Sequence, residues 1–200
     1  MELTNTLSFL AAPFAMCLIL AGIHCYLGLH VLARGVIFVD LSLAQVAAFG
    51  ATCAVFLGLD HHSVETYFVS LGATFLGAAL FALARRHENL FSQEAIIGIV
   101  YALASASVVL VVDKIAHGAE HIKDLLVGQV LWVTWPEVYK TAAIYGCVSV
   151  VHFVFRKQLI RTSFGLQKEH RGFWDFLFYA LFGVVITSSV SIAGVLQVFA

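Results

Sequence analysis

Long apolar stretches separated by short polar breaks run along the whole chain. Six of them reach the length of about 18 residues that a membrane-spanning helix needs: 9–33, 36–59, 67–84, 95–112, 138–155 and 173–200. A further apolar piece, 125–135, is too short to cross a bilayer and contains Gly128. The pattern predicts an all-α integral membrane protein, a polytopic helix bundle with six spans and one short re-entrant or interfacial helix.

Composition supports the membrane class. Hydrophobic residues make up 61% of the chain and charged residues 12%, with a mean hydropathy of +0.94. So much apolar surface cannot be buried within a water-soluble domain of this length, so membrane lipid is the expected surrounding. The net charge is −1 and the basic residues form no patch, which argues against nucleic acid as a partner. The four cysteines lie in apolar stretches without Cys-x-x-Cys spacing and are interpreted as small hydrophobic residues.

The distribution of basic residues predicts the orientation. With six spans, one side carries eight of them: Arg34, Arg85, Arg86, Arg156, Lys157, Arg161, Lys168 and Arg171. The other side carries three, Lys114, Lys123 and Lys140. Cytoplasmic loops collect Lys and Arg, so we expect an external N-terminus in a multi-pass protein of the cell (inner) membrane. This count requires that 125–135 does not cross the bilayer.

Both ends of the chain carry information on its organisation. The first residues lack the basic region and cleavage site of a signal peptide, so the first apolar stretch is expected to be a retained span. The last stretch continues to Ala200 without a polar flank, from which we expect residues 1–200 to be one transmembrane domain truncated at its C-terminal end. No Gly-x-x-x-x-Gly-Lys-Ser/Thr motif occurs, so any ATP must bind to a partner chain.

Asp40 is an isolated carboxylate within an apolar stretch. At helical spacing it shares a face with Ala44, Ala47 and Ala54, where another helix can approach closely. A charged Asp at mid-membrane costs roughly 2.5–3.5 kcal/mol, so such residues are usually paired, protonated or functional. Asp40 is therefore a candidate for a translocation path. The alternative is a structural role near the polar break, in which it pairs with Arg34 or caps a helix.

Histidines supply the other candidate metal ligands. His117, Glu120 and His121 would lie on one side of an outer helix, and imidazole with carboxylate suits zinc, manganese or iron. The alternative is a solvated surface or docking segment. His24 lies deep in the first span and is either a pathway residue or a structural histidine with a partner across the bundle.

The longest inner polar segment, 156–171, contains Phe164 and Leu166. A short amphipathic helix of this kind could insert into a cytoplasmic partner. The alternative is a basic loop held at the lipid headgroups.

Four blocks of sequence carry a family resemblance: 38–50 (FVDLSLAQVAAFG), 94–106 (EAIIGIVYALASA), 117–128 (HGAEHIKDLLVG) and 191–199 (SIAGVLQVF). Together they resemble permeases of the zinc/manganese-type ABC importers. The resemblance implies a permease homodimer, two cytoplasmic ATP-binding subunits and an extracytoplasmic metal-binding protein. The divalent metal would be the transported substrate, with no cofactor bound permanently and no catalysis by this chain.

The same resemblance implies roles for single residues. Members carry Asp-x-x-x-His in the second span, and here Asp40 matches whereas Ala44 occupies the histidine position, so only Asp40 is carried over. By the same analogy, the ATPase-docking helix would lie within 161–171 and include Arg161, Phe164, Leu166 and Arg171. The alternative function is an ion-coupled secondary carrier or cation channel with Asp40 as its ion site. A metallo-enzyme is disfavoured because the buried polar residues form no three-ligand set.

Overall fold

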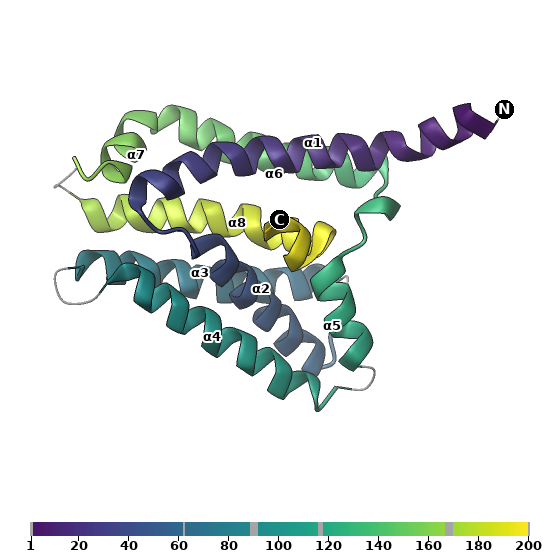
Figure 1. Ribbon diagram of the computed structural model, residues 1–200, viewed down its shortest axis with the longest axis horizontal. Coiled ribbons are helices and arrows are strands. Elements are labelled where there is room, and N and C mark those ends of the chain that lie inside the picture. Colours follow the sequence, from purple (N-terminus) through teal and green to yellow (C-terminus); the bar gives the residue numbers. More distant parts are fainter. Residues whose placement is uncertain (1, 62, 89–91, 116–117, 167–169, 200) are drawn as a thin grey trace.

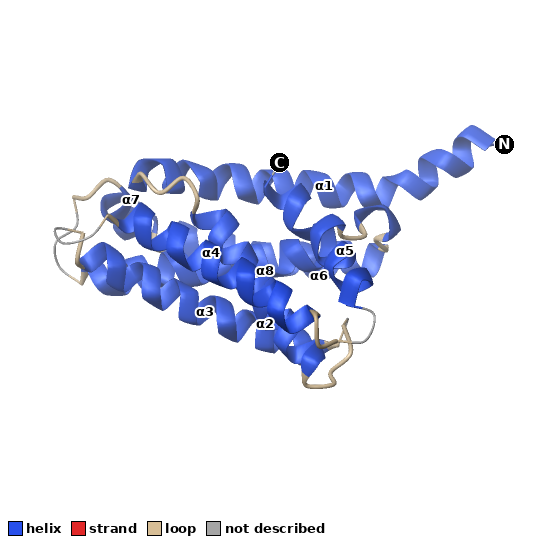
Figure 2. Cartoon of the chain, turned by 60° about the horizontal axis from the view of Figure 1, so that its bottom comes forward, coloured by secondary structure: helices blue, strands red, loops and turns tan. Residues whose placement is uncertain are grey.

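The chain folds into long helices joined by short connections (Figure 1). The computed structural model describes residues 2–61, 63–88, 92–115, 118–166 and 170–199. These residues form α1 (Glu2–Arg34), α2 (Val39–Phe56), α3 (Val64–Arg86), α4 (Gln93–Val112), α5 (Gly118–Val127), η1 (Val130–Trp132), α6 (Trp135–Val154), α7 (Arg156–Ser163) and α8 (Arg171–Phe199). No strand occurs among the described residues (Figure 2). The prediction of an all-α fold is confirmed.

Five of these helices are long and apolar enough to cross a membrane: α1, α2, α3, α4 and α8. The pair α6 and α7 provides a sixth candidate span, which bends by 80° at the junction of the two helices. α6 runs alongside α1, while α7 turns across the end of the bundle (Figure 1). The predicted polytopic bundle is therefore confirmed, with α7 as a separate helix at one end.

The short helix was predicted at the wrong position. It occupies Gly118–Val127 rather than 125–135, and the later apolar residues form only η1. Gly128 ends the helix because its backbone has φ +64°, a left-handed conformation that favours glycine. Hydropathy marked the most apolar part of this segment, whereas the helix formed where apolar and polar residues alternate at helical spacing.

Helix α2 lies at the centre of the bundle and packs against α3, α4 and α8. Its predicted small-residue face is the contact face, with Ala44, Ala47 and Ala54 buried. At Gly50 the approach is so close that an added Cβ would lie 2.8 Å from the Cα of Ser70. The Ser70 hydroxyl also donates a hydrogen bond to the Ala47 carbonyl at 2.7 Å. Small residues and an interhelical hydrogen bond thus provide the close packing that lipid alone does not drive.

A second close approach joins the outer segment after α5 to α8. Gly194 interrupts α8 with φ 75° and ψ 162°, a conformation open essentially only to glycine. A Cβ at Gly194 would collide with the backbone of Gly128 and Val127. The Gln129 amide donates to the Ile192 carbonyl at 2.9 Å across the same crossing. Two glycines therefore allow the two backbones to touch.

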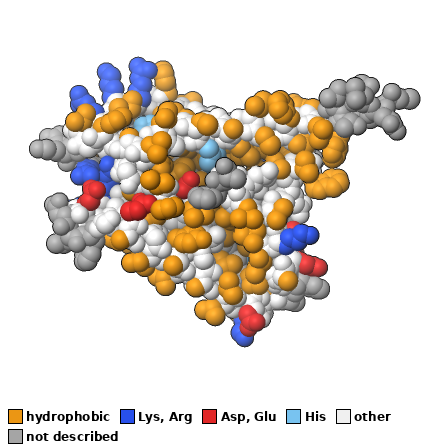
Figure 3. Space-filling model, in the orientation of Figure 1, with side chains coloured by type: hydrophobic (Ala, Val, Ile, Leu, Met, Phe, Trp, Pro, Cys, Tyr) orange, Lys and Arg blue, Asp and Glu red, His pale blue; other side chains and the backbone are white. Residues whose placement is uncertain are grey.

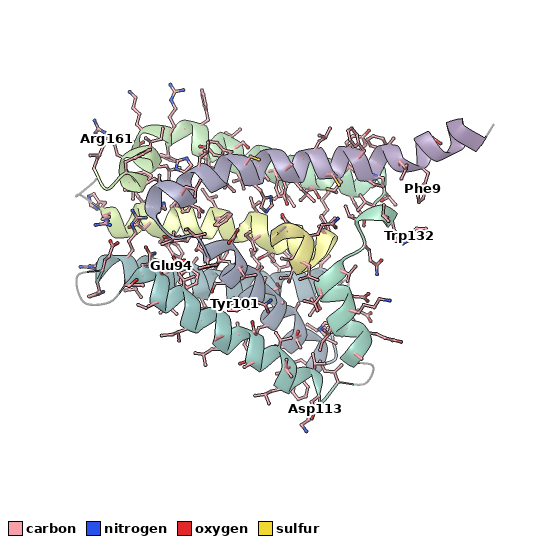
Figure 4. The ribbon with its side chains drawn as sticks, viewed as in Figure 1. Phe9, Glu94, Tyr101, Asp113, Trp132 and Arg161 are labelled. Carbon is pink, nitrogen blue, oxygen red and sulfur yellow. The ribbon has the colours of Figure 1, made fainter. Side chains whose placement is uncertain are left out.

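The two ends of the molecule differ in composition. Figure 3 shows basic side chains gathered at the end that contains α7, and hydrophobic ones over the face crossed by α1, α2 and α4. Arg161 lies at this end and Asp113 at the opposite end of α4 (Figure 4). Phe9 and Trp132 meet edge to face near the N-terminus, with ring centroids 6.0 Å apart. This polarity matches the predicted topology, and the assignment of sides stays a prediction.

Candidate functional site

A cavity of about 270 Å³ lies at the end of the bundle that contains α5. Its walls come from α2, α3, α5, α6 and α8, together with the loop between α2 and α3. Its polar lining comprises His61, Ser63, Thr66, Tyr67, Ser70, His121, Asp124, Glu137, Lys140, Thr141, Thr187, Ser188 and Ser191. Most of the wall helices are candidate spans, so the cavity lies between spans, and we call it the outer cavity after the side predicted for this end.

His121 points into this region from α5. Its Nδ1 lies 2.7 Å from Nδ1 of His61, and its Nε2 lies 3.1 Å from the Thr52 hydroxyl. The side chain is buried, so the solvated-surface alternative is wrong for His121. Loss of solvation, and after it the neighbouring His61, lower the pKa of His121 to about 4. The imidazole is therefore neutral at pH 7 and retains a lone pair for a metal ion.

The structure describes two of the three residues that were predicted as an outer metal-binding group. His117 lies outside the described residues, and Glu120 is exposed in the first turn of α5. Among the described residues, no group of three or more His, Cys, Asp or Glu side chains is arranged to hold a metal ion. The structure instead pairs His121 of α5 with His61, which lies in the loop between α2 and α3.

Asp40 lies in the first turn of α2 and is half-buried. Its Oδ1 accepts a hydrogen bond from the Leu41 amide at 2.7 Å. Nearby, Glu94 of α4 accepts one from the Phe38 amide at 3.1 Å. Both carboxylates are thus at a helix N-terminus, where the backbone dipoles favour negative charge. Arg34 does not pair with Asp40, because it binds Asp175.

His24 and Asp40, the two candidates within the spans, are brought into electrostatic range of each other. The His24 Nδ1 donates to the Leu20 carbonyl at 2.8 Å. Its Nε2 is buried and has no hydrogen-bond partner within the described part of the chain. The bundle therefore brings a half-buried carboxylate and a buried imidazole into electrostatic range, without a direct contact between them within the described part of the chain. Ala44 is buried one turn after Asp40 and adds no ligand.

A buried ion cluster holds α7 in place at the opposite end. Asp175 of α8 binds Arg34 at 2.5 Å and approaches Arg85 at 3.5 Å. Arg34 also donates to the Ser163 hydroxyl at 3.2 Å, and Arg85 donates to the Thr162 carbonyl at 3.1 Å. The same two arginines therefore connect α1 and α3 to both Asp175 and the last turn of α7. We name Asp175, Arg34 and Arg85 the inner ion cluster.

The residues expected to dock an ATPase fall into two groups. Arg161, Phe164 and Leu166 are exposed on or directly after α7, and the two apolar side chains are 65% and 75% exposed. Arg171 instead turns toward the bundle, where it approaches Asp175 at 3.7 Å and Glu88 at 3.4 Å. The exposed surface thus contains Arg161, Phe164 and Leu166. Arg171 is not part of this surface, because its side chain contacts Glu88 and Asp175.

The model of the ABC 3 transport family matches residues 6–200, nearly the whole chain. The chain belongs to this family. A curated relative, a probable iron transport system membrane protein of Haemophilus influenzae, is 24% identical over 189 residues. That alignment covers 90% of this chain and 63% of the relative, so the chain spans less than two thirds of the relative's length.

Solved structures share the fold of this ABC 3 chain. PsaBC from Streptococcus pneumoniae, in complex with Fab, aligns with a TM-score of 0.76 at 18% identity, over 99% of this chain and 72% of that one. An inward-facing putative metal-chelate type ABC transporter aligns with a TM-score of 0.67 at 14% identity, over 97% and 66%. At these identities the likeness concerns the fold alone. The shared fold agrees with the assignment of this chain as a multi-pass helical membrane protein.

Several residues of the ABC 3 chain were not singled out by sequence reasoning. His61 and Thr52 complete the contact with His121, and Asp175 is the centre of the inner ion cluster. For Asp175 a signal existed, because a lone carboxylate four residues after Arg171 starts an otherwise apolar stretch. For His61 none did, since it meets His121 only through the tertiary fold.

Proposed function

We propose that this protein is the membrane subunit of an ATP-driven importer for a divalent metal ion. The observation that carries the proposal is α7, an eight-residue helix that lies across the inner end of a family-matched bundle. Its exposed apolar residues and Arg161 offer a docking surface, and the chain has no phosphate-binding loop of its own. A separate ATP-binding subunit is therefore the partner that this surface fits.

A metal ion is supported as substrate by the chemistry along the bundle. The outer cavity contains imidazole and carboxylate groups, and Asp40 with His24 provides a second polar position within the spans. These ligand types suit zinc, manganese or iron. The chain is similar to a probable iron transport system membrane protein and shares the fold of a metal-chelate type transporter, and both support the same class of substrate. We propose zinc or manganese as the ion.

Asp40 also supports a homodimer. Its carboxylate is only half-buried, and Figure 3 shows acidic and histidine side chains among hydrophobic ones on the face crossed by α1, α2 and α4. A second copy packed on this face would remove the carboxylate from lipid and enclose a path between the protomers. An extracytoplasmic metal-binding protein would deliver the ion to the outer cavity.

Uptake of radiolabelled zinc and manganese tests the proposal in cells that express the protein with its ATP-binding subunit. Uptake should stop when the phosphate-binding lysine of that subunit is replaced. Uptake that continues without ATP hydrolysis would contradict the proposal and favour an ion-coupled carrier that uses Asp40.

Asp40→Asn tests the path itself. The change keeps the shape of the side chain and removes its charge, so uptake should fall at least about 10-fold while the amount of folded protein stays the same. Glu65→Gln, at the start of α3, is the matched control, because it also removes a carboxylate charge in the first turn of a span and keeps the shape of the side chain. Normal uptake by Asp40→Asn would remove Asp40 from the path.

A further inference from the structure

Two histidines that are far apart in sequence meet beside the outer cavity. His61 is exposed in the loop between α2 and α3, whereas His121 is buried on α5. Both line the cavity, and their Nδ1 atoms are 2.7 Å apart. This is hydrogen-bond distance, so one of the two nitrogens carries a proton and the other accepts it.

The hydrogen bonds around His121 decide which nitrogen accepts. The Thr52 hydroxyl donates its only proton to the Ala48 carbonyl at 2.7 Å. Thr52 can therefore only accept from His121, so Nε2 of His121 carries the proton at the 3.1 Å contact. In the neutral ring, Nδ1 is then a lone pair that points at His61. A ring nitrogen fixed in this way by its other N–H is the arrangement typical of metal-ligating histidines.

The geometry lies close to that of a metal site. Two nitrogens bound at about 2.0–2.1 Å to a tetrahedral ion are roughly 3.3 Å apart, so the rings need to separate by only about 0.6 Å. His61 is exposed and can move its shared proton to Nε2 through solvent, which leaves both Nδ1 lone pairs facing the ion without net loss of a proton. His61, which lies in a loop, would make this movement, and His121 would stay in place.

The surroundings fit a hydrated cation. Asp124 is exposed on the cavity wall, while the carboxylate of Glu137 is already held by the amide and hydroxyl of Thr134 at 2.7 and 2.8 Å. Lys140 is the opposing charge on the same wall. The cavity of about 270 Å³ has room for about nine waters at their liquid volume, enough to complete the coordination shell.

We propose that His61 and His121 form an outer binding site for a borderline-soft divalent cation of the zinc class. Two protein ligands bind such an ion without retaining it, which suits a position that must release the ion inward. This site adds a first binding position to the proposed importer. It rests on the proposed function only for the direction in which the ion moves. Binding itself depends on the two imidazoles and on Thr52.

Direct titration of the purified full-length protein tests binding. Zn²⁺ is followed by calorimetry and Co²⁺ by its visible absorption, in wild type, His61→Ala and His121→Ala. Each variant should lose at least about 10-fold in affinity. His87→Ala should not change it, because this exposed histidine follows the C-terminal end of α3, whereas the N-terminal turn of α3 lines the cavity. Thr52→Val preserves shape and both imidazoles, and should weaken binding about 10- to 100-fold through loss of the acceptor for His121. Equal zinc affinity in wild type and His61→Ala would overturn the site.

Uptake separates this proposal from the importer function. His61→Ala should raise the zinc concentration for half-maximal uptake about 10-fold and leave the maximal rate unchanged, because only capture is affected. Unchanged half-saturation in His61→Ala would overturn the transport role of the site even if ATP-driven uptake persists. Failure of ATP dependence in wild type would instead overturn the importer function, and the titrations would still decide binding.

Discussion

Asp175→Asn is expected to destabilise the protein strongly, because the inner ion cluster then has buried positive charge without its carboxylate. The Arg34 side chain is fully buried and Asp175 is 1% exposed, so solvent cannot replace the lost partner. Breaking a buried pair on one side costs about 3–5 kcal/mol. The Phe178 ring, 4.0 Å from the Arg34 guanidinium, offsets only part of this cost. For a protein of this size the loss corresponds to a melting temperature lower by about 6–20 °C.

Thermal unfolding in detergent measures this loss, with Asp113→Asn as the matched control. Asp113 pairs with Lys114 at 2.9 Å, but both side chains are about 70% exposed, so its replacement should have little effect. Arg34→Gln added to Asp175→Asn should cost less than it does alone, because its partner is already gone. Equal melting temperatures for Asp175→Asn and Asp113→Asn would refute the role assigned to the cluster.

The same perturbation has a local consequence for α7. Arg34 and Arg85 contact both Asp175 and the last turn of α7, so we expect their hold on α7 to weaken when the carboxylate is removed. A cysteine introduced at Leu159, which is fully buried on α7, should react with a maleimide faster in the Asp175→Asn background than in wild type. Equal reaction rates would mean that α7 stays docked without the carboxylate.

Three further results are expected. With native cysteines removed, a cysteine at Lys114 should react with an impermeant thiol reagent in intact cells and one at Arg156 should not; the reverse pattern would overturn the topology. Phe164→Ala with Leu166→Ala should lower ATPase stimulation several-fold at unchanged expression, because both side chains are exposed beside α7, and full stimulation would contradict docking there. Gly194→Ala should cost about 1–3 kcal/mol in backbone strain before any collision with Gly128, whereas Gly146→Ala, with open space around it, should be mild in the same thermal melts.

The spans could be predicted from the sequence because hydropathy depends on neighbouring residues alone. The small-residue face of α2 was predicted for the same reason, since helical spacing defines a face without knowledge of its partner. The short helix was predicted too late in the sequence because polar residues such as His121 lower the mean hydropathy where α5 forms. In addition, Gly128 ends this helix and is not part of it.

Contacts between distant segments could not be predicted in this way. His61 and His121 are 60 residues apart, and Arg34 and Asp175 are 141 apart. In each case the residues are brought together by the order and tilt of several helices, which periodicity does not encode. The alternative for Asp40 was a pairing with Arg34, which is close to it in sequence, but Arg34 pairs with Asp175 of α8.

The contact between Gly128 and Gly194 has a consequence for the order of assembly during synthesis. α5 and the segment after it rest on the backbone of α8, which is made more than 60 residues later. This end of the bundle therefore cannot adopt its final arrangement until α8 has been made and has packed against it. Until then the segment after α5 lacks the backbone on which it rests, and the cavity beside His121 lacks the wall that α8 provides, so the proposed binding of a metal ion there requires α8 to be in place.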